Sequence, residues 1–155
     1  MSIPVWTECV LVGLYSVIIF IVIDCFFSFV KRRNFPHNRE EYGGTILFLT
    51  GFFKHFMGWI FSLQSLYCNY GNACVRTTGD DKIYWADETF IIPESILEGV
   101  LYVTVGWLLF SLSFPLGINK LFWWKWTILF VSGVIIHFLA EWMGIHGLYC
   151  KYKCI

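Results

Sequence analysis

FIIPESILEGVLYVTVGWLLFSLSFPL, residues 90–116, is the stretch of sequence that decides the fold. It is apolar almost throughout, and at about 1.5 Å of helical rise per residue it is long enough to cross roughly 30 Å of membrane hydrocarbon. Its only charged side chains, Glu94 and Glu98, are four residues apart and therefore share one face of a helix. Charged side chains inside apolar helices are costly, so they usually face a cavity or a partner rather than lipid. The stretch predicts a membrane helix with one functional face.

Three more apolar runs of similar length occur, at approximately residues 5–30, 44–66 and 126–145. The first run has no basic segment before it and is too long for the core of a signal peptide, so we interpret it as a transmembrane helix. We therefore predict an all-α integral membrane protein in which residues 1–155 form a single domain, a bundle of four transmembrane helices with approximate bounds 5–30, 44–66, 90–116 and 126–145.

The composition agrees with a membrane protein. Hydrophobic residues make up 57% of the chain and charged residues only 14%, whereas soluble domains are roughly 25% charged. The formal net charge is zero, so nothing indicates a nucleic-acid partner. These numbers exclude an ordinary soluble enzyme.

The basic residues predict the orientation of the bundle. Lys31, Arg32 and Arg33 follow the first run, and Lys120 and Lys125 lie between the third and the fourth. Both connections fall on the same side if all four runs span the membrane, and the positive-inside rule makes that side cytoplasmic. Both termini are then expected to be lumenal or extracellular.

Four cysteines fall on the opposite side from these basic residues: Cys68, Cys74, Cys150 and Cys154. Disulfides persist on the non-cytoplasmic side, so all four are disulfide candidates, and their three possible pairings stay open. A zinc site is an alternative, but the oxidising side and the lack of paired CxxC motifs argue against it, and we expect no metal. A thiol oxidoreductase would also require a CxxC pair.

Two histidines and a tryptophan complete the candidate functional residues. His137 and Glu141 are four apart in the last run and share a helix face, while His55 lies within the second run. Trp107, in the middle of the third run, could stack on a flat apolar ligand or stabilise a carbocation. For each of these residues, packing or an ion pair between helices is the alternative to a functional role.

Several short motifs resemble the emopamil-binding protein family of sterol isomerases, which carries the EXPERA membrane domain. The similar positions are Gly79-Asp80, Asp87, Glu94-Ser95-Ile96, Trp107, Phe138-Leu139 and Glu141. The sequence departs from the family in two ways. The glutamate that follows the histidine of the second helix by one turn is missing beside His55, and a fifth helix has no counterpart in these residues.

The resemblance implies an acid–base shift of a ring double bond in a 3-hydroxysterol, in the membrane of the endoplasmic reticulum and without a cofactor. Such a shift needs an acid, a base and a means of stabilising the cation between them. On this interpretation Glu94, His55 and Glu98 are catalytic, and Trp107, His137 and Glu141 bind the sterol. A relative that binds a sterol or another membrane lipid without catalysis is equally compatible with the departures.

A different class of function stays open beside this one. The chain could be a non-enzymatic accessory or structural subunit of a larger membrane complex, or form a homo-oligomer. The carboxylates inside the membrane would then pair with cations of a partner. The two hypotheses differ in one structural expectation, which is whether Glu94, Glu98 and His55 line a cavity or point outward.

Overall fold

The structure is a computed structural model, and it describes residues 3–34, 43–78, 83–87, 89–117 and 123–154. Within these ranges the chain is helical apart from short connections and one isolated bridge between Ala86 and Cys154. The helices are α1 (Val5–Asn34), α2 (Gly43–Ile60), α3 (Leu63–Tyr70), α4 (Asn72–Thr78), α5 (Ile91–Ser113), α6 (Trp124–Trp142) and α7 (Ile145–Lys153). The all-α prediction is confirmed for this part of the chain.

Three helices, α1, α5 and α6, are individually long and apolar enough to cross a membrane. The second predicted span, 44–66, is not one straight helix: α2 ends at Ile60, and α3 continues at an angle of 75°. The break lies at Ser62, whose left-handed φ of 57° interrupts the helical path. The described residues thus contain three candidate membrane spans, or four if α2 and α3 together form one bent span.

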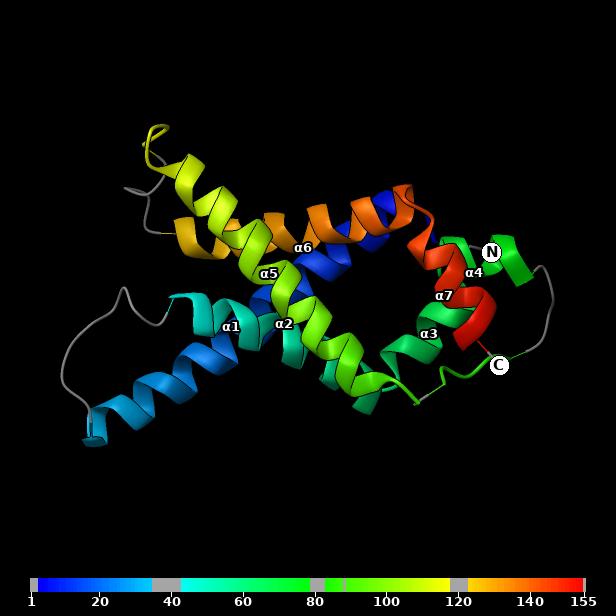
Figure 1. The fold of residues 1–155 in the computed structure, drawn as a ribbon, viewed down its shortest axis with the longest axis horizontal. Coiled ribbons are helices and arrows are strands. Elements are labelled where there is room, and N and C mark those ends of the chain that lie inside the picture. The colour runs from blue at the N-terminus through cyan, green and yellow to red at the C-terminus, as the bar shows by residue number, and fades with distance from the viewer. Residues whose placement is uncertain (1–2, 35–42, 79–82, 88, 118–122, 155) are drawn as a thin grey trace.

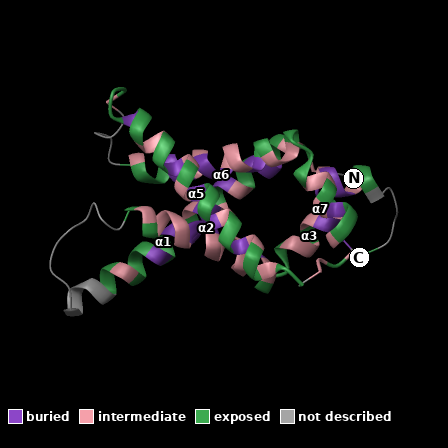
Figure 2. Ribbon diagram, in the orientation of Figure 1, coloured by how far each residue is buried: buried purple, intermediate pink, exposed green. Residues whose placement is uncertain are grey.

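The long helices pack mainly in two pairs, α1 with α6 and α2 with α5. Glycines let the backbones approach closely, as small residues commonly do between membrane helices. A Cβ atom added to Gly51 of α2 would lie 2.6 Å from the carbonyl oxygen of Glu98 in α5. One added to Gly133 of α6 would lie 2.6 Å from the hydroxyl of Ser16 in α1. Figure 2 shows buried residues where these helices meet and exposed residues on their outward faces.

The short helices α3, α4 and α7 form a separate layer at one end of the bundle, here called the disulfide cap (Figure 1). Of the three possible cysteine pairings, the structure contains Cys68–Cys154 and Cys74–Cys150. These bridges join α3 and α4 to α7, three helices whose cysteines are buried together. Cys9 and Cys25 of α1 are not bridged.

Both termini of the described chain lie at the capped end, whereas α1 ends and α2 begins at the other end (Figure 1). The end of α5 and the start of α6 also lie there. This arrangement places the bridged cysteines opposite the two connections that were predicted to be cytoplasmic. Lys120 and the side chains of Lys31, Arg32 and Arg33 lie outside the described residues, and the orientation in a membrane stays a prediction.

Candidate functional site

The predicted catalytic residues come together between α2 and α5. The two ring nitrogens of His55 contact two different carboxylates: Nδ1 lies 2.8 Å from Oε2 of Glu98, and Nε2 lies 3.3 Å from Oε2 of Glu94. Both glutamates sit on one face of α5, as their spacing predicted, and that face is turned toward α2. The three side chains that were predicted to be catalytic therefore lie in contact with one another.

Two lysines neutralise these carboxylates. The Nζ of Lys54 forms an ion pair with Glu98, and both side chains are largely buried. The Nζ of Lys153, which comes from α7 in the disulfide cap, lies 3.2 Å from Oε1 of Glu94. We call these five residues (Lys54, His55, Glu94, Glu98 and Lys153) the inner cluster. Since each carboxylate already has a cation from the same chain, the cluster balances most of its own charge.

Gln64 of α3 covers the histidine of the inner cluster. Its amide nitrogen lies 3.1 Å from Nε2 of His55, and its amide oxygen accepts a hydrogen bond of 3.3 Å from Tyr149 of α7. An amide nitrogen is only a donor, so the contact with Gln64 requires an unprotonated Nε2, whereas the contact with Glu94 requires a proton on it. His55 can therefore exchange one hydrogen-bond arrangement for another by gaining or losing a proton.

A second set of polar residues lies at the junction of α1, α6 and the disulfide cap. The Nε2 of His137 lies 3.3 Å from Oε2 of Glu8, and the Nδ1 of His146 lies 3.1 Å from Oε2 of Glu141. The two imidazole rings are 4.4 Å apart. With Asn72 and Arg76, described next, these four residues form what we call the cap cluster. His137 and Glu141 share a helix face, but each contacts a different partner.

Glu141 is the most heavily bonded group of the cap cluster. Arg76 donates to its Oε1 over 2.5 Å, and the side-chain amide of Asn72 donates to the same oxygen over 3.0 Å. Burial, followed by the neighbouring charge of His137, lowers the pKa of His146 to about 4. At neutral pH His146 is thus uncharged, and its Nδ1 can carry the proton that is donated to the Glu141 carboxylate.

The third predicted ligand residue, Trp107, lies apart from both clusters. Its side chain is 51% exposed, and it contacts Phe110 of the same helix. Nine residues separate it from Glu98, which corresponds to about 13 Å along a helix. The structure therefore does not bring Trp107 together with His137 and Glu141 in one ligand site.

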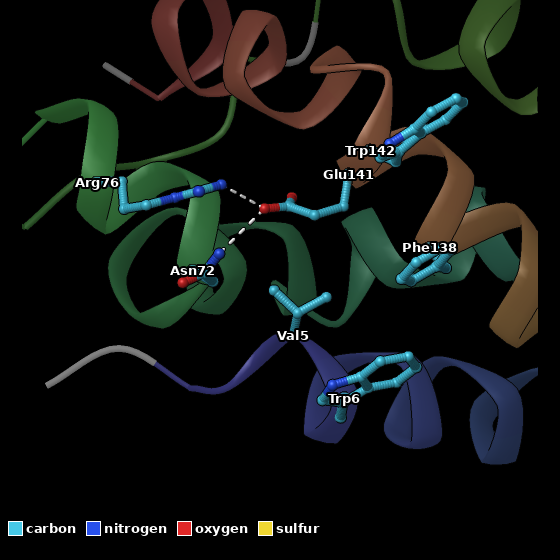
Figure 3. A pocket seen from close by; sticks show the side chains of 7 residues that line it. All are labelled: Val5, Trp6, Asn72, Arg76, Phe138, Glu141 and Trp142. Atoms are coloured by element: carbon cyan, nitrogen blue, oxygen red, sulfur yellow. Dashed lines mark hydrogen bonds and ion pairs between the residues drawn. The ribbon is translucent and has the colours of Figure 1, made fainter.

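The described residues form at least two surface hollows, and the inner cluster lines neither of these two. The first, of about 410 Å³, lies between α1, α4 and α6 and is shown in Figure 3. We call it the Glu141 groove; its lining residues are Val5, Trp6, Asn72, Arg76, Phe138, Glu141 and Trp142. The second, of about 450 Å³, lies along α3 and includes Ser65, Asn69 and Trp85. The cavity that was expected around Glu94, Glu98 and His55 is absent from these two hollows.

Sequence reasoning missed Lys153 and Gln64. Both are remote in sequence from the residues they contact, and nothing in their local sequence marks them as partners of a membrane glutamate and a histidine. Comparison with known proteins adds no assignment: no family model, curated protein or solved structure matches the chain. Gly79 and Asp80 of the resembling motifs lie outside the described residues.

Proposed function

We propose that this chain is a membrane protein that binds a sterol-like lipid in the Glu141 groove without transforming it. The observation that carries the proposal is the composition of that groove, which has flat aromatic side chains beside one hydrogen-bonded carboxylate (Figure 3). A sterol offers a matching pair of features, a flat apolar ring system and one hydroxyl group. The resemblance to the emopamil-binding protein family points to the same class of ligand.

The aromatic side of the groove is formed across two helices. The rings of Trp6 and Phe138 stack with centroids 5.4 Å apart, and Trp142 lies beside them on α6. Such rings offer a large apolar surface with few rotatable bonds. About 410 Å³ is at the lower end of the usual size of ligand sites, roughly 300–1,000 Å³. A sterol would be held at one edge and would leave the rest of its surface to the surrounding lipid.

The polar side of the groove would hold the hydroxyl group. Oε1 of Glu141 already accepts from Arg76 and Asn72, and a carboxylate oxygen pair has about four acceptor sites in all. A sterol hydroxyl could donate to one that is unused. The groove opens where α1 and α6 reach the disulfide cap, so the ligand would lie near one membrane surface, on the lumenal side if the protein resides in the endoplasmic reticulum as we propose.

A photoreactive sterol tests this proposal on the full-length protein in detergent or lipid nanodiscs. Trp6→Ala and Phe138→Ala should each weaken labelling by more than about tenfold, a loss of about 1.4 kcal/mol in binding free energy. Trp107→Ala is the matched control and should label normally. A sterol with a 3-keto group has no proton to donate and should compete poorly. Equal labelling of Trp6→Ala and Trp107→Ala would contradict the assignment of the groove.

Isomerisation is a second candidate, because one observation favours it. His55 sits between two carboxylates at 2.8 and 3.3 Å, and its two hydrogen-bond arrangements differ by one proton. A double-bond shift requires just such proton donation to one carbon and removal from another. If the chain is an isomerase, Glu94→Gln should lower turnover by roughly 10²-fold or more. Gas chromatography coupled to mass spectrometry, which separates double-bond isomers of equal mass, decides this, and an inactive wild-type protein would remove the candidate.

The accessory-subunit hypothesis draws no support from the inner cluster. That hypothesis predicts that the membrane carboxylates pair with cations of a partner protein. In the structure, Glu94 and Glu98 instead pair with Lys153 and Lys54 of the same chain. The lysine partners also bear on catalysis, because an ion-paired carboxylate is a weaker base than a free one. For this reason we rank binding ahead of isomerisation.

A further inference from the structure

The four sulfur atoms of the disulfide cap lie closer together than two separate bridges require. Cys74 and Cys154 belong to different bridges, yet their Sγ atoms are 3.1 Å apart. The Sγ atoms of Cys68, Cys74 and Cys154 all lie within 4.8 Å of one another, and Cys150 is bonded to Cys74. All four residues are buried. The bridges therefore form one compact group of four sulfurs.

Three helices bring these sulfurs together. Cys150 and Cys154 are one turn apart at the end of α7, where the amide of Cys154 contacts the carbonyl oxygen of Cys150 at 3.4 Å. Cys68 comes from α3 and Cys74 from α4. A group of ligands that converges from separate elements onto one point is the usual construction of a structural metal site.

We propose that, when both disulfides are reduced, Cys68, Cys74, Cys150 and Cys154 bind one zinc ion. Zinc prefers four thiolates in a tetrahedron with Zn–S distances of about 2.3 Å, which places the sulfurs roughly 3.8 Å apart. The Sγ atoms of Cys74 and Cys154, from different bridges, are 3.1 Å apart, and those of Cys68, Cys74 and Cys154 lie within 4.8 Å of one another, so the separations among these three sulfurs bracket that value. Small shifts of the side chains are enough to convert two bridges into one tetrahedral site.

The surroundings suit a thiolate site. Tyr67, Tyr84 and Tyr149 pack against the sulfurs and limit access of water. A zinc ion with four thiolates carries a net charge of −2, and α7 carries Lys151 and Lys153 in the same turn as two of the ligands. Burial together with nearby positive charge favours the thiolate–metal form over free thiolates.

The chemistry of the conversion balances with a named reductant. Two disulfides accept four electrons and four protons from two equivalents of a dithiol, which is oxidised to its own disulfide, and yield four thiols. Zinc binding then releases those four protons, because each ligand binds as a thiolate. The same helices of the disulfide cap would stay joined in both kinds of compartment. Disulfides would join them in an oxidising compartment, and a zinc ion would join them in a reducing one.

For the reduced protein, a zinc site takes the place of the expected absence of a metal. Zinc binding at these cysteines does not depend on the proposed lipid binding. The zinc alternative was set aside from sequence because no paired CxxC motif is present. Structural zinc sites require convergence in space, however, and spacings of five and three intervening residues can supply it when three helices meet.

Cobalt(II) provides a coloured probe for the test. The full-length protein in detergent is reduced without oxygen by a phosphine. Each disulfide oxidises one phosphine to its oxide, whose oxygen atom comes from water, and the reagent supplies no thiol ligands. One cobalt ion per chain should bind, with the sulfur-to-cobalt charge-transfer bands and visible bands of tetrahedral thiolate sites, and zinc should displace it. X-ray absorption of the zinc form should count four sulfur neighbours at about 2.3 Å.

The controls separate these cysteines from the rest of the chain. Cys9→Ser with Cys25→Ser should leave the cobalt spectrum unchanged, whereas Cys74→Ser or Cys154→Ser should abolish the four-sulfur spectrum. The oxidised protein should bind no cobalt. A reduced wild-type protein without the tetrahedral spectrum, or fewer than four sulfurs around zinc, overturns the proposal without reference to any variant.

Discussion

The inner cluster and the cap cluster both bury carboxylates, but they neutralise them in different ways. In the inner cluster, Glu98 pairs with Lys54 and Glu94 pairs with Lys153, and both carboxylates also contact His55. In the cap cluster, Glu8 contacts the imidazole of His137, and Glu141 contacts the imidazole of His146 and one exposed arginine. The carboxylates of the inner cluster are thus each paired with an ammonium group, whereas those of the cap cluster depend more on imidazoles, and burial lowers the pKa of one of these, His146.

The largest expected effect comes from removing the buried lysine of the inner cluster. Lys54→Met leaves the buried carboxylate of Glu98 without its ammonium partner, which should lower the free energy of unfolding by about 3–5 kcal/mol. Thermal unfolding in detergent measures the loss. Adding Glu98→Gln to the same chain should recover most of it, and a single variant as stable as wild type would show that the pair is not structural.

Removing one disulfide tests how much the disulfide cap contributes to stability. Cys74→Ser with Cys150→Ser removes a link between residues 76 apart and should cost about 2–5 kcal/mol. The cap should loosen while the pairing of Lys54 with Glu98 persists. In the wild-type protein, alkylation under denaturing and non-reducing conditions should label only Cys9 and Cys25. Four or more labelled thiols would contradict the two bridges.

Lowering the pH should weaken the cap cluster through His146. The pKa of His146 is lowered to about 4 from 6.5, so the folded state takes up its proton less readily than the unfolded state. The stabilising contribution is complete above pH 6.5 and is lost as the pH falls from 6.5 toward 4, by up to about 3 kcal/mol. Unfolding measured across this range should show the slope, and His146→Gln should flatten it. An unchanged slope in that variant would assign the protons elsewhere.

Helix packing behind the inner cluster should be sensitive to one methyl group. Gly51→Ala places a Cβ 2.6 Å from the carbonyl oxygen of Glu98, so α2 and α5 must separate at a cost of about 1–3 kcal/mol. Gly58→Ala on the same helix is the matched control, because nothing lies within 4 Å of its added Cβ. That control should be neutral or stabilising by up to about 1 kcal/mol. Equal effects at both positions would show that α2 and α5 are not in close contact.

The smallest expected effect concerns the bend between the two regions. Ser62 adopts a left-handed φ of 57°, which glycine tolerates better than serine. Ser62→Gly should therefore raise stability slightly, by less than about 1 kcal/mol, because glycine also has more conformational freedom when unfolded. A marked loss of stability in calorimetry would indicate that the serine side chain has a role of its own at the bend.

Local signals in the sequence predicted the main elements. Hydropathy located α1, α5 and α6, and a spacing of four residues placed Glu94 and Glu98 on one face, where the structure brings His55 to them. These predictions worked because length, hydropathy and helical period depend only on neighbouring residues. The placement of the four outer cysteines at one end followed from counting the spans.

Contacts between distant residues could not be predicted in the same way. The pairing of Cys68 with Cys154 and the approach of Lys153 to Glu94 depend on how α7 folds back, and no local pattern encodes that path. The break at Ser62 was missed because neither glycine nor proline, the usual signals of a break, occurs from Trp59 to Leu66. Trp107 was chosen for its chemistry, and the structure places it away from both clusters because spacing alone does not fix which face a neighbouring helix covers.

The two bridges also impose an order on folding during synthesis of the chain. Cys154 is made 86 residues after Cys68, and Cys150 is made 76 residues after Cys74. At about 5–20 residues per second, translation separates the partners by roughly 4–17 s. During that interval the disulfide partners of Cys68 and Cys74 have not yet been synthesised. Glu94 is likewise synthesised before Lys153, its ion-pair partner. The nascent chain must therefore be shielded from premature oxidation, and the last turn of α7 closes the structure only when synthesis has passed it.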